Sequence, residues 1–280
     1  MARLAESSYG KREVRLTKVV RTAELHTLYE LTVAITLGGL FDRVYTDGDN
    51  SSCIPTDTMK NTVYALARMR EFDGPEVFAR ILADHFLTFP QVTWAEVDIE
   101  AASWTRISVD GGPHPHAFTR GGSGSRTGRV RAERNHPTRT WGGLTGLEVL
   151  KTTGSGFRGF HRDRYTTLAE TSDRIFATAI DASWEYAPDA AVPSAVFEAA
   201  RDSLLETFAT HPSASVQQTI HAMGEALLAR VPQITSVSLS LPNQHRLLVN
   251  LQPFGLDNPN QIFVATSEPY GLIQGTMTRE

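Results

Sequence analysis

Residues 53–61, CIPTDTMKN, place a hydroxyl group and a carboxylate directly before an apolar pattern with helical spacing. Thr56 or Asp57 could cap a helix that begins near Thr58, because a short oxygen side chain accepts hydrogen bonds from the free N–H groups of a first turn. A cap accounts for only one of these polar side chains. Polar groups at a helix N-terminus also form a natural site for an anion or another polar ligand. The residues themselves leave both interpretations open.

Histidines suggest a second chemistry, since imidazole is a common metal ligand. His114 and His116 flank a proline in an extended segment, and His136 follows later in the sequence. Zinc sites built around histidine usually add a cysteine pair or an acidic third ligand, and the sequence offers no cysteine pair here. We therefore predict no metal site here.

Residues 154–159, GSGFRG, match the G-x-G-x-x-G fingerprint of dinucleotide-binding proteins. That fingerprint needs a helix directly after the glycines and a repeated alternation of strands and helices around it. Residues 161–173 show no helical pattern and lead into another extended segment. We therefore predict a glycine-rich turn. The sequence also lacks G-x-S-x-G and a Walker lysine, the commonest hydrolase and nucleotidase signals.

A basic stretch between residues 106 and 139 could indicate nucleic-acid binding. Its arginines stand at positions 106, 120, 126, 129, 131, 134 and 139. Aromatic side chains for base stacking are nearly absent from it, so a solvated hairpin or a subunit contact is the better interpretation. The net charge of −4 and the pI near 6.1 also disfavour nucleic acid and anionic membranes as partners. A small ligand is favoured instead.

Length and composition describe a globular protein: the chain has 280 residues, of which 41% are hydrophobic and 21% are charged. This length suggests about two domains. Cys53 is the only cysteine, so no intrachain disulfide can form and a reducing compartment, the cytoplasm, is expected. No apolar run approaches the roughly 20 residues that span a bilayer. The N-terminal residues lack a secretory signal and the last four, MTRE, form no peroxisomal address.

Hydrophobic periodicity predicts the same order of elements in both halves of the chain. The first half has strands at 13–21 and 28–39, helices at about 57–71 and 75–88, a strand at 92–107 and its partner strand across the loop containing DGGPHPH. The second half has strands at 144–153 and 174–187, helices at about 193–210 and 215–230, and an extended segment at 236–251 that Pro242 interrupts. The order is strand, strand, helix, helix, strand, strand, twice.

The grouping of strands apart from helices predicts an α+β fold with antiparallel sheets and helices on one face. We expect two tandem repeats, residues 1–139 and 140–280. Such long strands would leave open sheet edges, and the association of several subunits into a closed barrel would remove them. An oligomer is therefore expected.

Six motifs resemble the urate oxidase family, in the same order and over nearly the whole chain. They are Tyr9-Gly10-Lys11, residues 49–61 (DNSSCIPTDTMKN), 147–160 (LEVLKTTGSGFRGF), 162–175 (RDRYTTLAETSDRI), 213–217 (SASVQ) and 240–245 (SLPNQH). The resemblance implies the tunnelling fold, or T-fold, with two ββααββ repeats per subunit. It also implies a homotetramer whose sheets close a barrel-like tunnel.

The resemblance implies catalytic roles for Lys11, Thr56 and His245, in which Lys11 activates the Thr56 hydroxyl and His245 relays protons. Asn243 would lie beside dioxygen. On sequence alone Lys11 is an ordinary surface lysine, and Asn243 and His245 are an ordinary turn asparagine and an exposed histidine. Because Pro242 ends a strand, Asn243 and His245 can project from one side of an extended turn.

The resemblance also implies a set of substrate-binding residues: Thr56, Asp57, Phe157, Arg174, Val216, Gln217 and Asn243. Phe157 would stack on the purine, and Arg174 and Gln217 would bind its oxygen and nitrogen edge, since a guanidinium and an amide match the donors and acceptors of urate. Val216 would contribute a backbone N–H at a helix start. Without the resemblance, Phe157 would be a core aromatic, and Arg174 and Gln217 a surface ion-pair residue and a polar residue of a first helical turn.

The activity implied by the resemblance is oxidation of urate by O₂ and water to 5-hydroxyisourate and H₂O₂, with no cofactor and no metal. Active sites would lie at subunit interfaces, and the missing peroxisomal address is consistent with a bacterial enzyme. The alternative is another tunnelling-fold enzyme that binds a purine or a pterin. Those relatives that use zinc need cysteine and histidine ligands, which Cys53 alone hardly supplies.

Overall fold

The computed structural model describes residues 3–188, 190–192 and 194–279. It divides into two compact units, Met1–Leu144 with Ser183–Phe197, and Thr145–Ala182 with Glu198–Glu280. The predicted division into sequence repeats at residues 139 and 140 remains a prediction. The predicted helix start at Pro193 lies outside the described residues.

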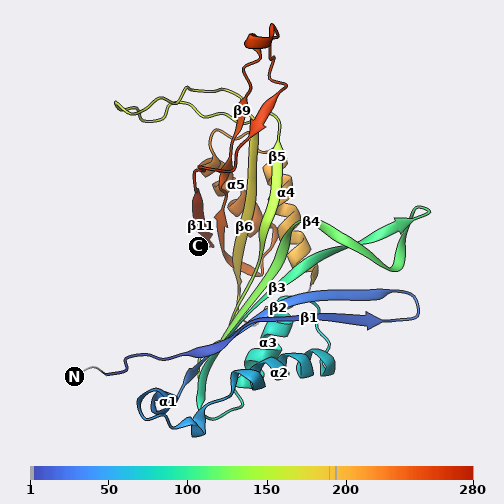
Figure 1. The fold of residues 1–280 in the computed structure, drawn as a ribbon, viewed down its shortest axis with the longest axis vertical. Helices are drawn as coiled ribbons and strands as arrows, with labels where there is room; N and C mark the ends of the chain where they lie inside the picture. Colours follow the sequence, from blue (N-terminus) through green and yellow to red (C-terminus); the bar gives the residue numbers. More distant parts are fainter. Residues whose placement is uncertain (1–2, 189, 193, 280) are drawn as a thin grey trace. The chain divides into compact units, whose positions relative to one another are not determined.

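The sheet of the first unit has four long strands: β1 (Tyr9–Arg21), β2 (His26–Gly39), β3 (Val92–Val109) and β4 (Gly112–Glu133). Each pairs with the next in antiparallel fashion, in the order β1-β2-β3-β4 (Figure 1). The predicted alternation along β2 is confirmed, because Leu31, Val33, Ile35 and Leu37 are each at most 1% exposed. The predicted partner strand of β3 is β4. The chain turns back between the two strands at Asp110 and Gly111.

Two of the helices of the first unit, α2 (Thr56–Met69) and α3 (Pro75–Phe86), pack against this sheet. The helical elements between β2 and β3 are α1 (Asp42–Thr46), the short helix η1 (Asn50–Ser52), α2 and α3. α2 packs on β1, and α3 packs on β3 and β4. Met59, Val63 and Leu66 of α2 are buried in the same apolar cluster as the inward side chains of β2, so the predicted helical stripe is confirmed.

The basic stretch lies mainly in the hairpin of β3 and β4, as predicted, and Arg120 and Arg129 are more than half exposed in their side chains. One arginine differs from that prediction. Arg126 is 13% exposed in its side chain and donates to Glu76, a fully buried carboxylate at the start of α3, over 2.7 Å. Arg129 and Arg131 pair with Asp98 and Glu96 of the neighbouring strand β3. Burying a charge is costly unless it is paired, and the pair of Arg126 and Glu76 meets this requirement inside the first unit.

The second unit repeats the pattern of strands followed by two helices. Its elements are β5 (Arg139–Lys151), β6 (Phe176–Tyr186), α4 (Ser194–Thr210), α5 (Val216–Arg230), β7 (Ile234–Ser240), β8 (Asn243–Gln244), β9 (Arg246–Leu248), η2 (Gln252–Phe254), β10 (Phe263–Ala265) and β11 (Gln274–Thr278). The strand order is β5-β6-β7-β11, with β8 on β6, and β9 and β10 form a separate hairpin. β5, β6 and α4 each run from one unit into the other.

Pro242 interrupts the last extended segment as predicted, since β7 ends at Ser240 and β8 begins at Asn243. The inward faces are also as predicted: Phe176, Ile180 and Trp184 of β6 are at most 1% exposed. None of the helices in the described part of the chain has the length and hydrophobicity that a bilayer-spanning helix needs.

Candidate functional site

Six of the nine predicted site residues line one cavity of the second unit, with a volume of about 370 Å³. They are Phe157, Arg174, Val216, Gln217, Asn243 and His245. We call it the Arg174 cavity. These residues come from the segment between β5 and β6, from the start of α5 and from the chain around β8, so the fold brings together positions that are far apart in the sequence.

The segment 154–157 follows β5 as a glycine-rich turn, as predicted, and no helix follows it. Gly154 has φ +74°, a left-handed conformation that favours glycine. The N–H of Phe157 donates to the carbonyl of Thr171 over 2.8 Å, and the N–H of Thr171 donates back over 3.1 Å. This pair of hydrogen bonds presents the Phe157 ring to the cavity.

Arg174 is partly buried, and burial lowers the pKa of its guanidinium. Its central carbon lies 5.6 Å from the centroid of the Phe157 ring. Among the described residues, no carboxylate forms a salt bridge with Arg174. Its donors are therefore available for an anion held over the aromatic ring.

The start of α5 is capped by side chains. The Oγ of Ser215 accepts a hydrogen bond from the N–H of Gln218 over 3.1 Å, and the Oε1 of Gln218 accepts one from the N–H of Ala214 over 2.9 Å. This confirms the helix start predicted at residues 213–215. Val216 and Gln217 are the first two helical residues, so their N–H groups have no partner within the helix. They offer donors at the positive end of α5.

Asn243 and His245 face the cavity from the chain around β8. Asn243 pairs with Thr178 of β6, and its N–H donates to the carbonyl of Gly271 over 2.9 Å. The carbonyl of His245 accepts a hydrogen bond from the N–H of Thr266 over 3.1 Å. Both residues line the same cavity. That their side chains project from one side of this segment remains a prediction.

Arg246 also lines the cavity, and the sequence interpretation missed it. Strict alternation places residue 246 on the face opposite to residues 243 and 245, but its long side chain bends back and donates to the carbonyl of His245 over 3.1 Å. The described lining thus holds two guanidinium groups and no aspartate or glutamate. Such a lining favours an anionic ligand.

The remaining three predicted residues belong to the first unit, where the predicted cap is wrong. α2 begins at Thr56, slightly before the start expected near residues 57 and 58. Its N-cap position is Pro55, which makes no side-chain cap hydrogen bond. Proline already holds φ near the helical value and can directly precede the first turn. Thr56 and Asp57 are therefore the first helical residues, and both are exposed.

Asp57 instead interacts with residues one turn further along α2. Its carboxylate accepts from the Nδ2 of Asn61 over 2.9 Å and forms an ion pair with Lys60. The hydrogen bond from Lys60 is the main cause that lowers the pKa of Asp57, and the positive charge of Lys11 adds to it. Asp57 thus also places a negative charge at the positive end of the helix.

Lys11 lies in β1 opposite Ile35, directly before an irregularity in the pairing with β2. A β-bulge of this kind changes the direction of nearby side chains. Within the described residues no hydrogen bond joins the side chains of Lys11 and Thr56. Thr56 and Asp57 are exposed at the beginning of α2, and the partly exposed Lys11 is near enough for its charge to act on Asp57.

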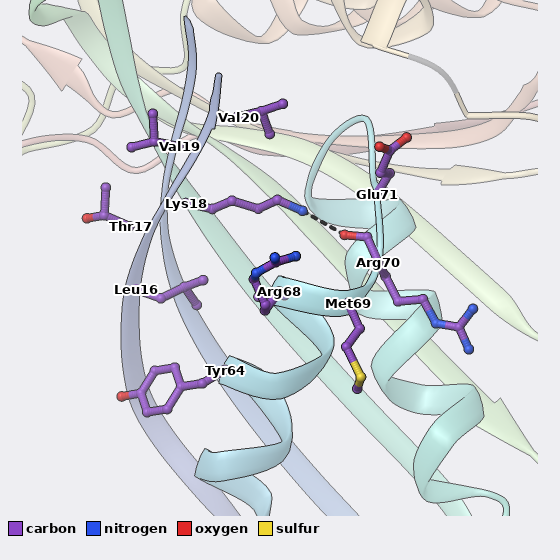
Figure 2. Close-up of a pocket in the computed structure, with 11 residues that line it drawn as sticks. Leu16, Thr17, Lys18, Val19, Val20, Tyr64, Arg68, Met69, Arg70 and Glu71 are labelled. Carbon is purple, nitrogen blue, oxygen red and sulfur yellow. Dashed lines mark hydrogen bonds between the residues drawn. The ribbon is translucent and has the colours of Figure 1, made fainter. Parts of the chain in front are cut away.

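A larger cavity of the first unit, of about 540 Å³, lies between β1 and the end of α2 (Figure 2). The Nζ of Lys18 donates to the carbonyl of Arg70 over 2.6 Å and lies 4.3 Å from the centroid of the Phe72 ring. Burial lowers the pKa of this lysine. Its ammonium group is thus engaged with the carbonyl of Arg70, the residue that follows α2. No predicted site residue lines this cavity.

No group of three or more histidine, cysteine, aspartate or glutamate side chains is arranged to hold a metal ion in the part of the chain that the structure describes. The rings of His114 and His116 lie 4.6 Å apart in β4, and the ring of His26 lies 5.8 Å from that of His116.

The family model described as Uricase matches residues 7–131 and 141–274. The chain belongs to the uricase family. It is 44% identical to the uricase of Arthrobacter globiformis over 278 residues, covering 99% of this chain and 90% of that protein. It is 39% identical to the uricase of Aspergillus flavus over 295 residues, covering 100% of this chain and 98% of that protein.

Solved uricase structures confirm the tunnelling fold. The crystal structure of uricase from Arthrobacter globiformis superposes with a TM-score of 0.94 at 43% identity, covering 100% of this chain and 96% of that one. A uricase from Bacillus fastidious superposes with a TM-score of 0.82 at 22% identity, covering 97% of this chain and 93% of that one, which shows the likeness of the fold alone. The predicted α+β class and the family resemblance are both confirmed.

Proposed function

We propose that this chain is a urate oxidase, which oxidises urate with O₂ and water to 5-hydroxyisourate and H₂O₂. The observation that carries the proposal is the Arg174 cavity of this uricase-family chain, in which six predicted residues meet and two guanidinium groups stand without a carboxylate. A planar purine anion fits such a lining.

Recognition follows from the donors and acceptors of the cavity. Arg174 can make two parallel hydrogen bonds to one edge of urate. Gln217 supplies both a donor and an acceptor from one amide, and the N–H of Val216 adds a donor at the positive end of α5. Phe157 stacks on the ring. Arg246 adds a second positive charge to the same lining.

Catalysis is assigned to Lys11, Thr56 and His245. Lys11 draws a proton from the Thr56 hydroxyl, which removes a second proton from bound urate. The resulting dianion is electron-rich enough to reduce O₂ itself, so the reaction needs no metal and no flavin. O₂ adds near Asn243, and the peroxide leaves as H₂O₂. Water activated through the same relay then gives 5-hydroxyisourate, and Asp57 helps to hold the purine.

The active enzyme is proposed to be a homotetramer whose sheets close a tunnel. In each site, Lys11 and Thr56 of one chain would complete the Arg174 cavity of a neighbouring chain. Exposed apolar side chains around β9 and β10 support assembly, because an interface between chains would remove their surface from water. They are Leu247, Leu248, Phe254, Leu256, Ile262 and Val264, each at least 49% exposed. The proposed compartment is the cytoplasm, which suits a chain with one cysteine.

The test is the aerobic oxidation of urate by protein that has been treated with a chelator and shows no flavin absorbance. We expect urate's ultraviolet absorbance to fall and one H₂O₂ to form per urate, with no reaction under argon. Absence of urate consumption in air would overturn the proposed function. Activity that is lost on chelation and restored by one metal ion would overturn the cofactor-free mechanism.

A further inference from the structure

We infer that Asp173 is a positioning residue of the urate site. Its carboxylate fixes the turn at 153–155 against the segment that carries Arg174, and thereby sets where Arg174 and Phe157 stand in the Arg174 cavity. This inference rests on the proposed function. It assigns a role to a residue that lines no part of the cavity itself.

Three donors from the turn meet on this one carboxylate. The hydroxyl of Thr153 donates to Oδ2 over 2.6 Å, and the N–H groups of Gly154 and Ser155 donate to Oδ1 over 2.7 and 3.3 Å. These hydrogen bonds lower the pKa of Asp173, and the one from the Thr153 hydroxyl has the largest effect. An ionised carboxylate can accept on both oxygens at once, so it holds the side chain of Thr153 and the turn backbone together.

The turn at 153–155 binds Arg174 directly, and further hydrogen bonds join Phe157 to the segment that carries Arg174. The N–H of Arg174 donates to the carbonyl of Ser155 over 2.7 Å, and Phe157 exchanges two backbone hydrogen bonds with Thr171. The hydroxyl of Thr171 also donates to the carbonyl of Asp173 over 2.8 Å. Arg174 and Phe157 therefore belong to one hydrogen-bonded frame, and Asp173 contributes to it through both its side chain and its backbone.

The same turn reaches the start of α5. The N–H of Ser213 donates to the carbonyl of Gly154 over 2.9 Å, and the N–H of Gly156 donates to the carbonyl of Ser213 over 2.8 Å. Ser213 precedes Val216 by three residues, is 4% exposed, and shares a buried 2.7 Å hydrogen bond with the hydroxyl of Thr219. All three segments that supply Phe157, Arg174 and Gln217 are thus joined through the turn that Asp173 fixes.

The experiment compares Asp173→Ala and Asp173→Asn with Asp163→Ala. Asp163 is a matched control because its carboxylate also accepts turn hydrogen bonds, from the N–H of Tyr165 and the hydroxyl of Thr166, each over 2.9 Å. Neither of those partners lines the cavity. Urate affinity is measured by calorimetry under argon, where no turnover occurs, and KM and kcat are measured in air.

We expect Asp173→Ala to weaken urate binding and raise KM by about tenfold or more, while kcat stays within about threefold, because the binding frame rather than the proton relay is disturbed. Asp173→Asn keeps one acceptor oxygen and should recover part of the affinity. Asp163→Ala should match the unsubstituted chain. Equal affinities for Asp173→Ala and Asp163→Ala would overturn the inference, as would a loss confined to kcat.

Two further variants keep the test decisive if Asp173→Ala does not fold. Thr153→Val removes one donor to the carboxylate with little change of shape, and it should raise KM in the same direction by a smaller factor. In an Arg174→Gln background, Asp173→Asn should add little further loss, because partners in one frame are not independent. Multiplicative losses would contradict positioning through Arg174. Urate oxidation by the unsubstituted chain, run in parallel, separates failure of this inference from failure of the proposed function.

Discussion

Arg174 carries most of the proposed recognition of urate, because its guanidinium is partly buried, lies near the Phe157 ring and has no carboxylate partner among the described residues. Arg174→Lys should raise the KM for urate by about tenfold or more, since an ammonium cannot make two parallel planar contacts. Steady-state kinetics measure this. Arg164→Lys, at an exposed arginine stacked on Tyr165, is the control. KM and kcat both within about twofold, a difference of about 0.4 kcal/mol, would remove the anchoring role.

Lys11 and Thr56 should behave as one catalytic unit. Because Thr56 makes no cap hydrogen bond, Thr56→Ala should leave the melting temperature almost unchanged while kcat falls by about 10² or more. Lys11→Met should cause a similar loss, and the double variant should lose little more than either alone. The neighbouring exposed Thr58→Ala is the control and should keep full kcat. Multiplicative losses in the double variant would separate Lys11 from Thr56.

At the scale of the elements, periodicity predicted the long strands and the helices α2 to α5, because both depend on local spacing, whereas α1 and the short strands β10 and β11 were not predicted. The stripe of Met59, Val63 and Leu66 in α2 is an example. The start of α2 was misplaced because the interpretation gave weight to the hydroxyl of Thr56 and too little to the fixed φ of Pro55. One proline outweighed a favourable capping residue.

Contacts between distant segments could not be predicted from periodicity. Asp173 binds donors 18 to 20 residues earlier in the chain, and no local pattern marks that closure. Arg246 was missed because alternation describes only the Cβ direction, whereas its long side chain bends back to the carbonyl of His245. The candidate site residues were named through family motifs, and only the three-dimensional structure shows six of them around one cavity.

Asp73 should stabilise the beginning of α4. Its Oδ2 accepts from the N–H of Ser194 over 3.0 Å, and its Oδ1 accepts from the Ser194 hydroxyl over 2.7 Å. Asp73→Ala should lower the free energy of unfolding by about 1 kcal/mol at neutral pH, as the loss of a helix cap does. Urea unfolding measures this. Asp84→Ala, which removes an exposed pair with Arg80 within α3, should cost only a few tenths of a kcal/mol.

The effect of Asp73 should depend on pH with a defined sign. The pKa of Asp73 is lowered in the folded chain, and the hydrogen bond from the Ser194 N–H has the largest effect on it. Its stabilisation is therefore present above the pKa of an unfolded aspartate, about 3.9, and is lost as the pH falls through the lower folded-state value. The difference between the unsubstituted chain and Asp73→Ala should shrink in acid. A constant difference from neutral pH to strong acid would contradict this assignment.

At the scale of the whole molecule, the candidate residues fall into two groups, each within one compact unit. Lys11, Thr56 and Asp57 belong to the first unit, and the Arg174 cavity belongs to the second. The central claim is that these groups act on one urate molecule and that a site takes them from two different chains. Neither group alone contains both the proposed base and the anion-binding residues.

Subunit complementation tests this claim most directly. Thr56→Ala and Arg174→Gln chains should each be nearly inactive alone. Co-expressed in equal amounts, they should recover about one quarter of the unsubstituted activity, since random pairing in a symmetric oligomer leaves that share of sites with both groups intact. A mixture of Thr56→Ala with Lys11→Met chains should recover nothing, because every site then carries a defective first-unit group. Urate oxidation is measured on mixed oligomers of verified composition. Recovery in the first mixture and none in the second is the predicted result, and an inactive first mixture would contradict a shared site.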